Sequence, residues 1–362
     1  MRHIIFTVTN DLNYDQRMIR ICTSLHNAGY EVTLVGRVEK KSESLTPKPY
    51  KQKRLRLFFS KGPGFYIEYN IRLFFYLLFK KFDCACAIDL DSILAVYFAT
   101  SIRQKKKVYD AHEYFSQLKE IVNRKGVYFV WHQIERIFLP RFKFGYTVSK
   151  SIADKFKLLY GVQYETIRNM PVFAGAQNIN SSAKDIIYQG AVNEARGFEF
   201  LIPAMKDVNA NLIIYGDGNF MGQARKIVEQ NGLTRKVIFK GRMLPAELNA
   251  VTSEGYVGIN LVENIGLNQY FSLANKFFDY IQHGVPQVTM DFPEYKLLND
   301  KYGIAVLLPN LEPSTISTAL NKIVNDTVLH HQIRQNCVLA ARELNWQTEE
   351  QKLIAFYKNI FG

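Results

Sequence analysis

The sequence has few of the features that mark secreted, zinc-binding or membrane-spanning proteins. It holds four cysteines in 362 residues, and none of them forms a C-x-x-C pair or a cluster with histidine. This pattern argues against structural zinc and indicates a reduced, cytosolic chain. The longest apolar run, residues 71–79, is interrupted by Arg72 and falls far below the roughly 20 residues that a spanning helix needs. The apolar stretch at the N-terminus is too short for a signal peptide, so we expect a protein that does not cross a membrane.

Acidic residues are scarce relative to basic ones in the first half of the chain. Residues 1–175 hold 29 Lys and Arg against 15 Asp and Glu, whereas residues 176–362 hold 17 against 18. The net charge of +13 therefore belongs to the first half, which predicts an anionic ligand or surface there. The segments KQKRLRLFFSK and FYIEYNIRLFFYLLFKK interleave the cations with apolar residues. This pattern favours contact with anionic lipid. The alternative is an ordinary amphipathic helix whose aromatic side chains belong to the core.

Short apolar runs alternate with longer amphipathic stretches along the chain, which is typical of βαβ units around a parallel sheet. The basic, proline-containing residues 37–63 are expected to form a long loop, and the small, polar residues 172–184 an interdomain linker. We therefore expect an α/β protein with two Rossmann-like domains, residues 1–172 and 185–345, and a final helix over 346–362. Two such domains are expected to hold a ligand in a cleft at the carboxyl ends of their strands.

The segment SLANKFFDYIQHGVP has the best spacing for binding a diphosphate. We expect a helix to begin at Ser272 or Leu273, where free backbone N–H groups and the positive end of the helix dipole suit an anion. Lys276 can neutralise that anion, and Asn275 can bond to phosphate or sugar oxygens. Asp279 lies one turn later on the same face and can accept hydrogen bonds from ribose hydroxyls. The plain alternative is an ordinary capped helix in which Lys276 pairs with Asp279.

Glycine-containing turns follow two predicted strands of the second half. Gly190 and Gly216 would let a ligand approach the backbone closely, and Arg196 offers a planar donor fork for phosphate oxygens. Each feature alone is also typical of an ordinary surface turn. The YGDG segment and Gly222 read G-x-G-x-x-x-G, one residue longer than the dinucleotide fingerprint. The first strand-to-helix turn lacks that fingerprint altogether, so an NAD-dependent dehydrogenase is disfavoured.

Polar residues also follow two predicted strands of the first half. His112, in the segment DAHE, can donate to a sugar hydroxyl, although a lone histidine is more often structural. Asp89 and Asp91 form a D-x-D pair of the kind that binds a metal next to a nucleotide sugar. Capping of the helix that starts near Ser92 explains Asp91 equally well. We therefore predict no metal site.

With these segments in view, the chain resembles glycosyltransferase family 4, the retaining enzymes with the GT-B fold of two Rossmann-like domains and a crossover C-terminal helix. The resemblance covers nearly the whole chain and lies in the order and spacing of TNDLNYDQRMIRICTSLHNAGYEVTLVGR, DLDSILA, YDAHEYF, VSKSIADKF, TIRNMP, YGDG, FKGR and SLANKFFDYIQHGVP. It implies that Arg196 and Lys276 bind the diphosphate and that His112 lies near the transferred sugar. It further implies donor-binding roles for Gly190, Gly216, Gly241, Arg242, Ser272, Leu273, Asn275 and Asp279, and acceptor-side positions for Asn10, Asp11 and Glu113.

The resemblance implies a retaining hexosyltransferase that moves a sugar from a nucleotide diphosphate sugar to an acceptor hydroxyl. It needs no metal and no cofactor besides this co-substrate, because fixed positive groups can stabilise the leaving diphosphate. The basic first half favours a lipid-linked glycan acceptor of surface polysaccharide synthesis, at the inner face of the cell membrane, and no nucleic acid partner. Two alternatives stay open: a sugar-nucleotide epimerase of the same fold, and a non-catalytic protein that binds nucleotide sugars or polyanions.

Overall fold

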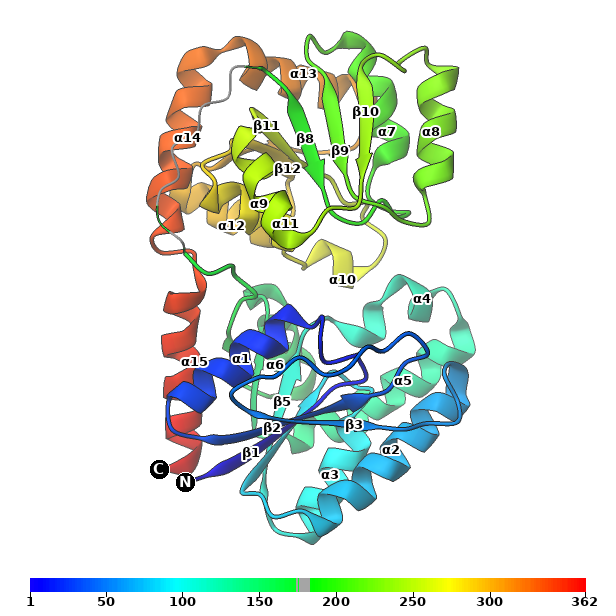
Figure 1. The fold of residues 1–362 in the computed structure, drawn as a ribbon, viewed down its shortest axis with the longest axis vertical. Helices are drawn as coiled ribbons and strands as arrows, with labels where there is room; N and C mark the ends of the chain where they lie inside the picture. The colour runs from blue at the N-terminus through cyan, green and yellow to red at the C-terminus, as the bar shows by residue number, and fades with distance from the viewer. Residues whose placement is uncertain (174, 176–182) are drawn as a thin grey trace. The chain divides into compact units, whose positions relative to one another are not determined.

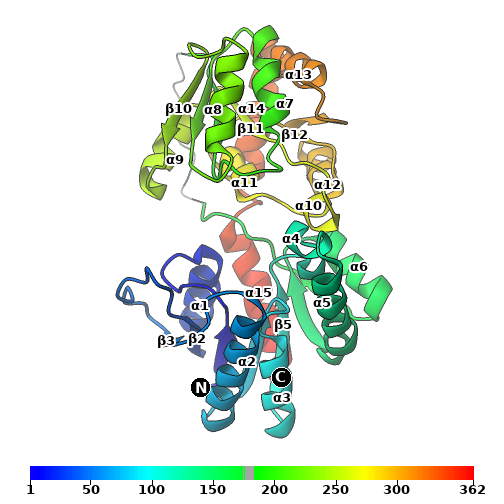
Figure 2. The same ribbon diagram turned by 90° about the vertical axis from the view of Figure 1, so that its right-hand side faces the viewer.

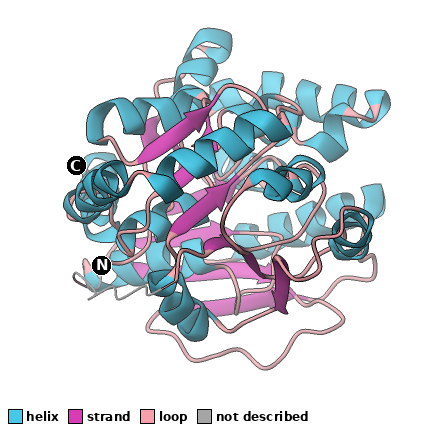
Figure 3. Ribbon diagram, turned by 90° about the horizontal axis from the view of Figure 1, so that it is seen from above, coloured by secondary structure: helices cyan, strands magenta, loops and turns pink. Residues whose placement is uncertain are grey.

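The structure is a computed structural model that describes residues 1–173, 175 and 183–362. The predicted linker over 172–184 lies largely outside the described residues, at 174 and 176–182. The described chain forms two compact units, and each holds one parallel sheet between helices (Figure 1, Figure 3). Unit 1 comprises Met1–Asn169, Gly266–Asn268 and Glu349–Gly362, and unit 2 comprises Met170–Ile265 and Gln269–Thr348. Among these residues, no helix combines the length and hydropathy that a bilayer crossing requires.

Unit 1 alternates strands and helices, as the sequence predicts. Its strands are β1 (His3–Thr7), β2 (Glu31–Arg37), β3 (Lys51–Leu55), β4 (Cys84–Ile88), β5 (Lys106–Ala111), β6 (Phe144–Thr147) and β7 (Glu165–Thr166). Its helices are α1 (Gln16–Asn27), α2 (Gly62–Phe79), α3 (Ile93–Ile102), α4 (Lys119–Val122), α5 (Lys125–Phe138) and α6 (Lys150–Tyr160), together with most of α15 (Trp346–Phe361).

The sheet of unit 1 has the strand order β3-β2-β1-β4-β5-β6-β7, and every neighbouring pair is parallel. The central strands β1 and β4 consist almost wholly of buried residues, because helices cover both faces of the sheet (Figure 2). Parallel strands bring their carboxyl ends to the same edge of a sheet. The residues that follow β1, β2, β4 and β5 therefore meet there.

The strand β3 corrects the prediction of a loop over residues 37–63. Its five residues, KQKRL, pair with β2 in parallel register, with Thr33 opposite Lys51. This strand lies at the edge of the sheet and most of its side chains are exposed or half-buried, so a basic sequence is tolerated. Charged residues on an edge strand also discourage pairing with another chain. The hydrophobic pattern of the sequence gives no sign of such a strand.

The last helix, α15, packs on unit 1, which confirms the predicted crossover helix. Its aromatic residues reach the centre of the sheet: the ring centroids of Tyr357 and Phe6 lie 5.9 Å apart, and those of Phe356 and Tyr146 lie 5.1 Å apart. The ammonium of Lys106 also donates to the carbonyl of Ile360. The helix, red in Figure 1, thus completes the core of a unit whose sheet comes from the first half of the chain.

Unit 2 repeats this architecture with a six-stranded sheet in the order β10-β9-β8-β11-β12-β13, again parallel throughout. Its strands are β8 (Ile186–Gln189), β9 (Leu212–Tyr215), β10 (Val237–Gly241), β11 (Val257–Asn260), β12 (Gln287–Met290) and β13 (Ala305–Leu308). Its helices are α7 (Phe198–Ala204), α8 (Met221–Gln230), α9 (Pro245–Glu254), α11 (Asn275–Gln282), α12 (Pro293–Tyr302), α13 (Pro313–Asn325) and α14 (Thr327–Ala341), and the short α10 (Leu267–Tyr270) joins β11 to α11.

Candidate functional site

The helix α11 begins at Asn275, so the prediction of a start at Ser272 or Leu273 is wrong. The hydroxyl of Ser272 donates to the carbonyl of Gln269 at 2.9 Å and thereby closes the preceding turn of α10. The residue before α11 is Ala274, whose backbone N–H donates to the Tyr295 hydroxyl at 3.0 Å. As a result Lys276 lies in the first turn of the helix, next to its free N–H groups.

Lys276 and Arg196 form a pair of cations beside the turn that follows β8. The ammonium of Lys276 lies 3.5 Å from the centroid of the Tyr188 ring. A methyl group added at Gly190 would stand 3.5 Å from the Cε atom of Lys276. Burial holds the pKa of Lys276 well below its ordinary value, the charge of Arg196 lowers it further, and only Asp279 opposes this shift. The charge of Arg196 also acts to lower the pKa of Tyr295, whose hydroxyl accepts from Ala274 directly before α11.

Neither cation has a counter-ion in the described part of the chain. No carboxylate there lies within ion-pairing distance of Lys276 or Arg196, so Lys276 is not paired with Asp279 as the plain alternative supposed. Two like charges close together destabilise each other, and a half-buried ammonium is poorly solvated. An anion bound at this place would relieve both effects. The arrangement is therefore suited to binding an anion.

Asp279 is held by Gln189, a residue that the sequence analysis missed. The side-chain amide of Gln189 donates to Asp279 Oδ2 at 3.0 Å, and its carbonyl oxygen accepts from the Thr252 hydroxyl at 2.5 Å. Gln189 is only 3% exposed, so these bonds fix the carboxylate next to the end of β8. The position of Gln189 directly before Gly190, at a strand end, is the signal that could have revealed it.

Three predicted donor-site glycines lie at the ends of neighbouring strands. Gly190, Gly216 and Gly241 follow or end β8, β9 and β10, and all have positive φ angles of 119°, 155° and 77°. The backbone N–H of Gly216 donates to the carbonyl of Gly241 at 2.8 Å, and that of Gly190 donates to Tyr215 at 2.9 Å. The structure thus brings these glycines together into one bare backbone surface at the carboxyl edge of the sheet.

Replacing Gly216 by alanine is expected to destabilise unit 2 by about 2–5 kcal/mol, the combined result of backbone strain and displaced backbone. The added Cβ atom would stand 1.8 Å from the carbonyl oxygen of Gly190. The matched control is Gly232→Ala, since Gly232 also has a positive φ but no atom near its Cβ position. It should lose no more than about 1–2 kcal/mol. Urea denaturation measures both, and equal losses would show that the close approach is unimportant.

The remaining donor-side candidates are less tightly placed. Arg242 follows Gly241 and is exposed, Asn275 is exposed at the first position of α11, and Leu273 is half-buried against the core of unit 2. Arg242 is therefore at the same sheet edge as the glycines. Its predicted contact with the nucleobase stays a prediction.

In unit 1, His112 follows β5 and is oriented by a buried ion pair. Its Nε2 atom lies 3.1 Å from Asp110 Oδ2, and Asp110 Oδ1 accepts from Arg17 Nη2 at 3.0 Å. Burial lowers the pKa of His112, but the charge of Asp110 outweighs it and raises the pKa above its ordinary value. Its backbone N–H is bound by Asp89 at 2.9 Å. Among the described residues Nδ1 has no partner, so it is the atom left to contact a substrate.

Asp91 of the D-x-D pair does not cap α3, so this interpretation of the sequence is wrong. At the start of α3 the Asn70 side chain accepts from the backbone N–H of Ala95 at 3.0 Å, whereas Asp91 Oδ2 accepts from the Thr9 hydroxyl at 2.5 Å. Burial raises its pKa to about 6. Asp89 uses one oxygen to bind the backbone of His112 and Glu113. Within the described ranges, no three His, Cys, Asp or Glu side chains are grouped as a metal site.

Two acceptor-side candidates are already bonded within unit 1, and one is exposed. Asp11 is buried and accepts from Arg54 at 2.5 Å, from Ser42, and from the backbone of Asn13. Burial opposes its ionisation, yet these bonds and the charge of Arg54 hold its pKa below the ordinary value. Asp11 therefore fastens residues 42–54 to the end of β1. The amide of Asn10 donates to Asp15 at 3.2 Å, and Glu113 is exposed.

Solved structures resemble the chain over its whole length. A sucrose-phosphate synthase from Thermosynechococcus elongatus superposes with a TM-score of 0.83 at 14% identity, covering 100% of this chain and 99% of that one. HepE from Anabaena, in complex with UDP-glucose, superposes at 0.76 with 11% identity, covering 99% and 100%. WaaG, a glycosyltransferase involved in lipopolysaccharide biosynthesis, superposes at 0.72 with 13% identity, covering 97% and 98%. The chain has the GT-B fold.

The sequence comparison is narrower and falls on unit 2. Residues 183–326 match the family model described as Glycosyl transferases group 1. No curated protein sequence matches the chain significantly. The matched segment contains the cation pair, the three glycines and α11. The GT-B fold and this match together support a glycosyltransferase, with the residues of the anion-binding site inside the matched segment.

Proposed function

We propose that this protein is a retaining, metal-independent glycosyltransferase that takes a sugar from a nucleotide diphosphate sugar. The observation that carries the proposal is the pair Lys276 and Arg196, two cations without a counter-ion beside a glycine-lined backbone. A diphosphate supplies the missing negative charge. Asp279, fixed by Gln189, accepts hydrogen bonds from the ribose hydroxyls. A solved structure with a similar fold supports a nucleotide diphosphate sugar as the donor, since HepE is described in complex with UDP-glucose.

The chemistry follows from where charge develops. As the bond from the sugar to the diphosphate breaks, negative charge accumulates on the leaving phosphate oxygen. Lys276, Arg196 and the N–H groups at the start of α11 are fixed and stabilise that charge without a metal. Attack by the acceptor hydroxyl on the same face retains the configuration, and the leaving phosphate takes the hydroxyl proton. His112, held by Asp110, positions the sugar through its Nδ1 atom.

A nucleotide screen by thermal shift tests this proposal. UDP, GDP, ADP and CMP are each added without metal and then with EDTA. One diphosphate should raise the melting temperature selectively, EDTA should not change the shift, and Lys276→Ala should make the shift smaller. If no nucleotide stabilises the protein, the transferase proposal fails and a non-catalytic role replaces it. Product formed from donor alone, without acceptor, would instead identify an epimerase.

His112→Ala should abolish sugar transfer and leave nucleotide binding nearly unchanged. His112 belongs to unit 1, whereas the proposed nucleotide site is built by unit 2. His26→Ala is the matched control, because His26 lies at the end of α1, away from the carboxyl edge of the sheet. Turnover is measured with the donor that the screen identifies, and binding by the same thermal shift. Normal turnover in His112→Ala would remove this residue from the site.

We further propose that the acceptor is a lipid-linked glycan at an anionic membrane surface. Helix α2 is apolar on two sides: it buries Phe65, Tyr69, Leu73 and Leu77, and it exposes Ile67, Ile71, Phe75 and Phe79. The core uses only the first set, so the second set is left for a partner. Cations follow the helix at Lys80 and Lys81, which suits anionic headgroups. Sedimentation with anionic vesicles at low salt should show binding, and its absence would exclude this acceptor.

A further inference from the structure

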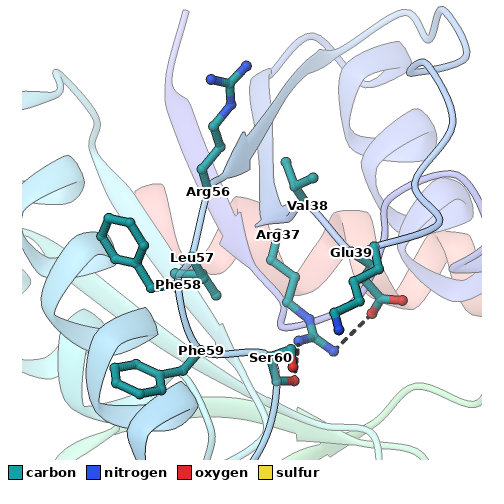
Figure 4. A pocket seen from close by; sticks show the side chains of 9 residues that line it. Arg37, Val38, Glu39, Arg56, Leu57, Phe58, Phe59 and Ser60 are labelled. Carbon is teal, nitrogen blue, oxygen red and sulfur yellow. Dashed lines mark hydrogen bonds and ion pairs between the residues drawn. The ribbon is translucent and has the colours of Figure 1, made fainter.

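A cavity of about 560 Å³ opens between two segments of unit 1 that play no part in the site described above. It is lined by residues 37–40, which follow β2, and by residues 56–60, which follow β3 (Figure 4). Both segments leave the sheet at its carboxyl edge, the edge that also carries His112. The cavity therefore lies on the acceptor side of the proposed reaction.

The lining of the cavity carries an excess of positive charge. Arg37 is neutralised by Glu39 at 2.9 Å and also donates to the carbonyl of Ser60 at 3.0 Å, as the dashed lines in Figure 4 show. Lys40 and Arg56 are exposed, and neither has a carboxylate partner within the described ranges. Figure 4 shows Arg56 pointing away from the Arg37–Glu39 pair. Two cations thus remain available to an anionic ligand.

The segment after β3 is held in place although its aromatic side chains are exposed. The carboxylate of Glu68 accepts from the backbone N–H of Phe58 at 2.9 Å and from that of Phe59 at 2.9 Å, and Arg72 donates to the same carboxylate at 2.7 Å. The Arg72 guanidinium also lies 5.1 Å from the centroid of the Phe58 ring. Phe58 nevertheless remains 88% exposed and Phe59 57% exposed. Aromatic rings fixed in solvent next to unpaired cations fit a ligand with both a charged and an apolar part.

The cavity is also electrostatically connected to His112. Burial raises the pKa of Asp91, and the charges of His112 and Arg37 both act to lower it. The face of the Arg37 guanidinium lies 4.4 Å from the Phe65 ring of α2, the helix with the exposed apolar side. The cavity thus adjoins α2 through Arg37 and lies at the same edge of the sheet as His112.

We propose that this cavity binds the phosphate group of the acceptor, and that this phosphate is carried on a membrane lipid. Lys40 and Arg56 bind the phosphate oxygens, and Phe58 and Phe59 enter the apolar region of the bilayer. That this phosphate belongs to the acceptor depends on the proposed function. Phosphate binding by the cavity does not depend on it. The same oxyanion chemistry also occurs in a free phosphate, so the experiment separates the two sources.

The test compares Lys40→Gln/Arg56→Gln with the charge-matched control Lys143→Gln/Lys157→Gln, whose lysines are exposed elsewhere on unit 1, before β6 and on α6. The full chain is sedimented with phosphatidylcholine vesicles that contain phosphatidic acid, or phosphatidylserine at the same surface charge. The wild type should prefer phosphatidic acid. The cavity variant should bind these vesicles about 30-fold more weakly, the combined effect of two cations at the surface, and the control less than about threefold more weakly. Equal losses in both variants, or no preference for phosphatidic acid, would overturn the proposal.

Two further measurements complete the design. Phe58→Ser should weaken vesicle binding without changing the affinity for inorganic pyrophosphate, which serves as the soluble probe. If pyrophosphate at low millimolar concentration displaces the wild type from vesicles and Phe58→Ser binds vesicles normally, a soluble phosphate is the ligand and the membrane source is wrong. The thermal shift with nucleotides should be unchanged in the cavity variant. If the wild type shows no such shift, the proposed function fails. The vesicle comparison still decides whether the cavity binds a lipid phosphate.

Discussion

Replacing Lys276 by alanine is expected to lower the rate of sugar transfer by about 10²–10³-fold, the usual loss when one fixed donor to a developing anion is removed. Lys276 lies in the first turn of α11, close to Arg196, and has no counter-ion within the described residues. Lys226→Ala is the control, since Lys226 is exposed on α8 of the same unit. Initial rates at saturating donor measure the effect. A rate within threefold of the wild type would exclude Lys276 from the reaction.

The same residue predicts how donor binding depends on pH. The pKa of Lys276 in the free protein lies well below its ordinary value because of burial and the charge of Arg196. A bound diphosphate favours the charged form and raises this pKa, so binding takes up protons and weakens as the pH rises above the pKa of the free protein. Calorimetry in buffers of different ionisation enthalpy measures the uptake. Lys276→Ala should show none, and uptake that persists in this variant would assign it to another group.

Replacing Asp110 by alanine is expected to destabilise unit 1 by about 3–5 kcal/mol, because it leaves a buried charge without its partner. The side chains of Arg17 and Asp110 are only 4% and 0% exposed, and their ion pair measures 3.0 Å. The Arg17 guanidinium also donates a hydrogen bond to the carbonyl of Ile167 at 3.1 Å. Urea denaturation followed by circular dichroism measures the loss. The double variant Arg17→Met/Asp110→Leu removes both charges and should recover most of the stability. A double variant no better than the single one would show that packing is the main contribution.

Asp110 also sets the protonation of His112, which adds a second observable. The pKa of His112 is raised above 6.5 in the folded protein. The stability that comes from this charge is therefore fully present below pH 6.5 and is lost as the pH rises through the folded pKa. Asp110→Ala should remove this part of the pH dependence. Titration of His112 by NMR should show its pKa lowered in the variant, and an unchanged pKa would contradict the assigned cause.

Patterns within one segment account for the elements that could be predicted. The apolar runs of β1 and β4 predict buried parallel strands, and Asp15 begins α1 by accepting from the backbone of Met18 at 3.0 Å. Gly190 and Gly216 could be singled out because a glycine at a strand end signals a close approach of backbone or ligand. The positions of Lys276 and Asp279 followed from helical spacing. All of these depend on residues a few positions apart.

The misplaced or missed features depend on partners that are distant in sequence. Strand β3 exists because β2 and the Asp11–Arg54 ion pair hold a basic segment at the edge of the sheet. Asp91 turns to Thr9, which is 82 residues away, instead of capping the next helix. Local periodicity reports which face of a segment is apolar, and so the sequence by itself determined two parallel α/β units and the list of charged candidates. Only tertiary packing decides which charges are neutralised. It pairs Asp11 with Arg54 and Arg17 with Asp110. It leaves four cations without counter-ions in the described chain: Lys276, Arg196, Lys40 and Arg56.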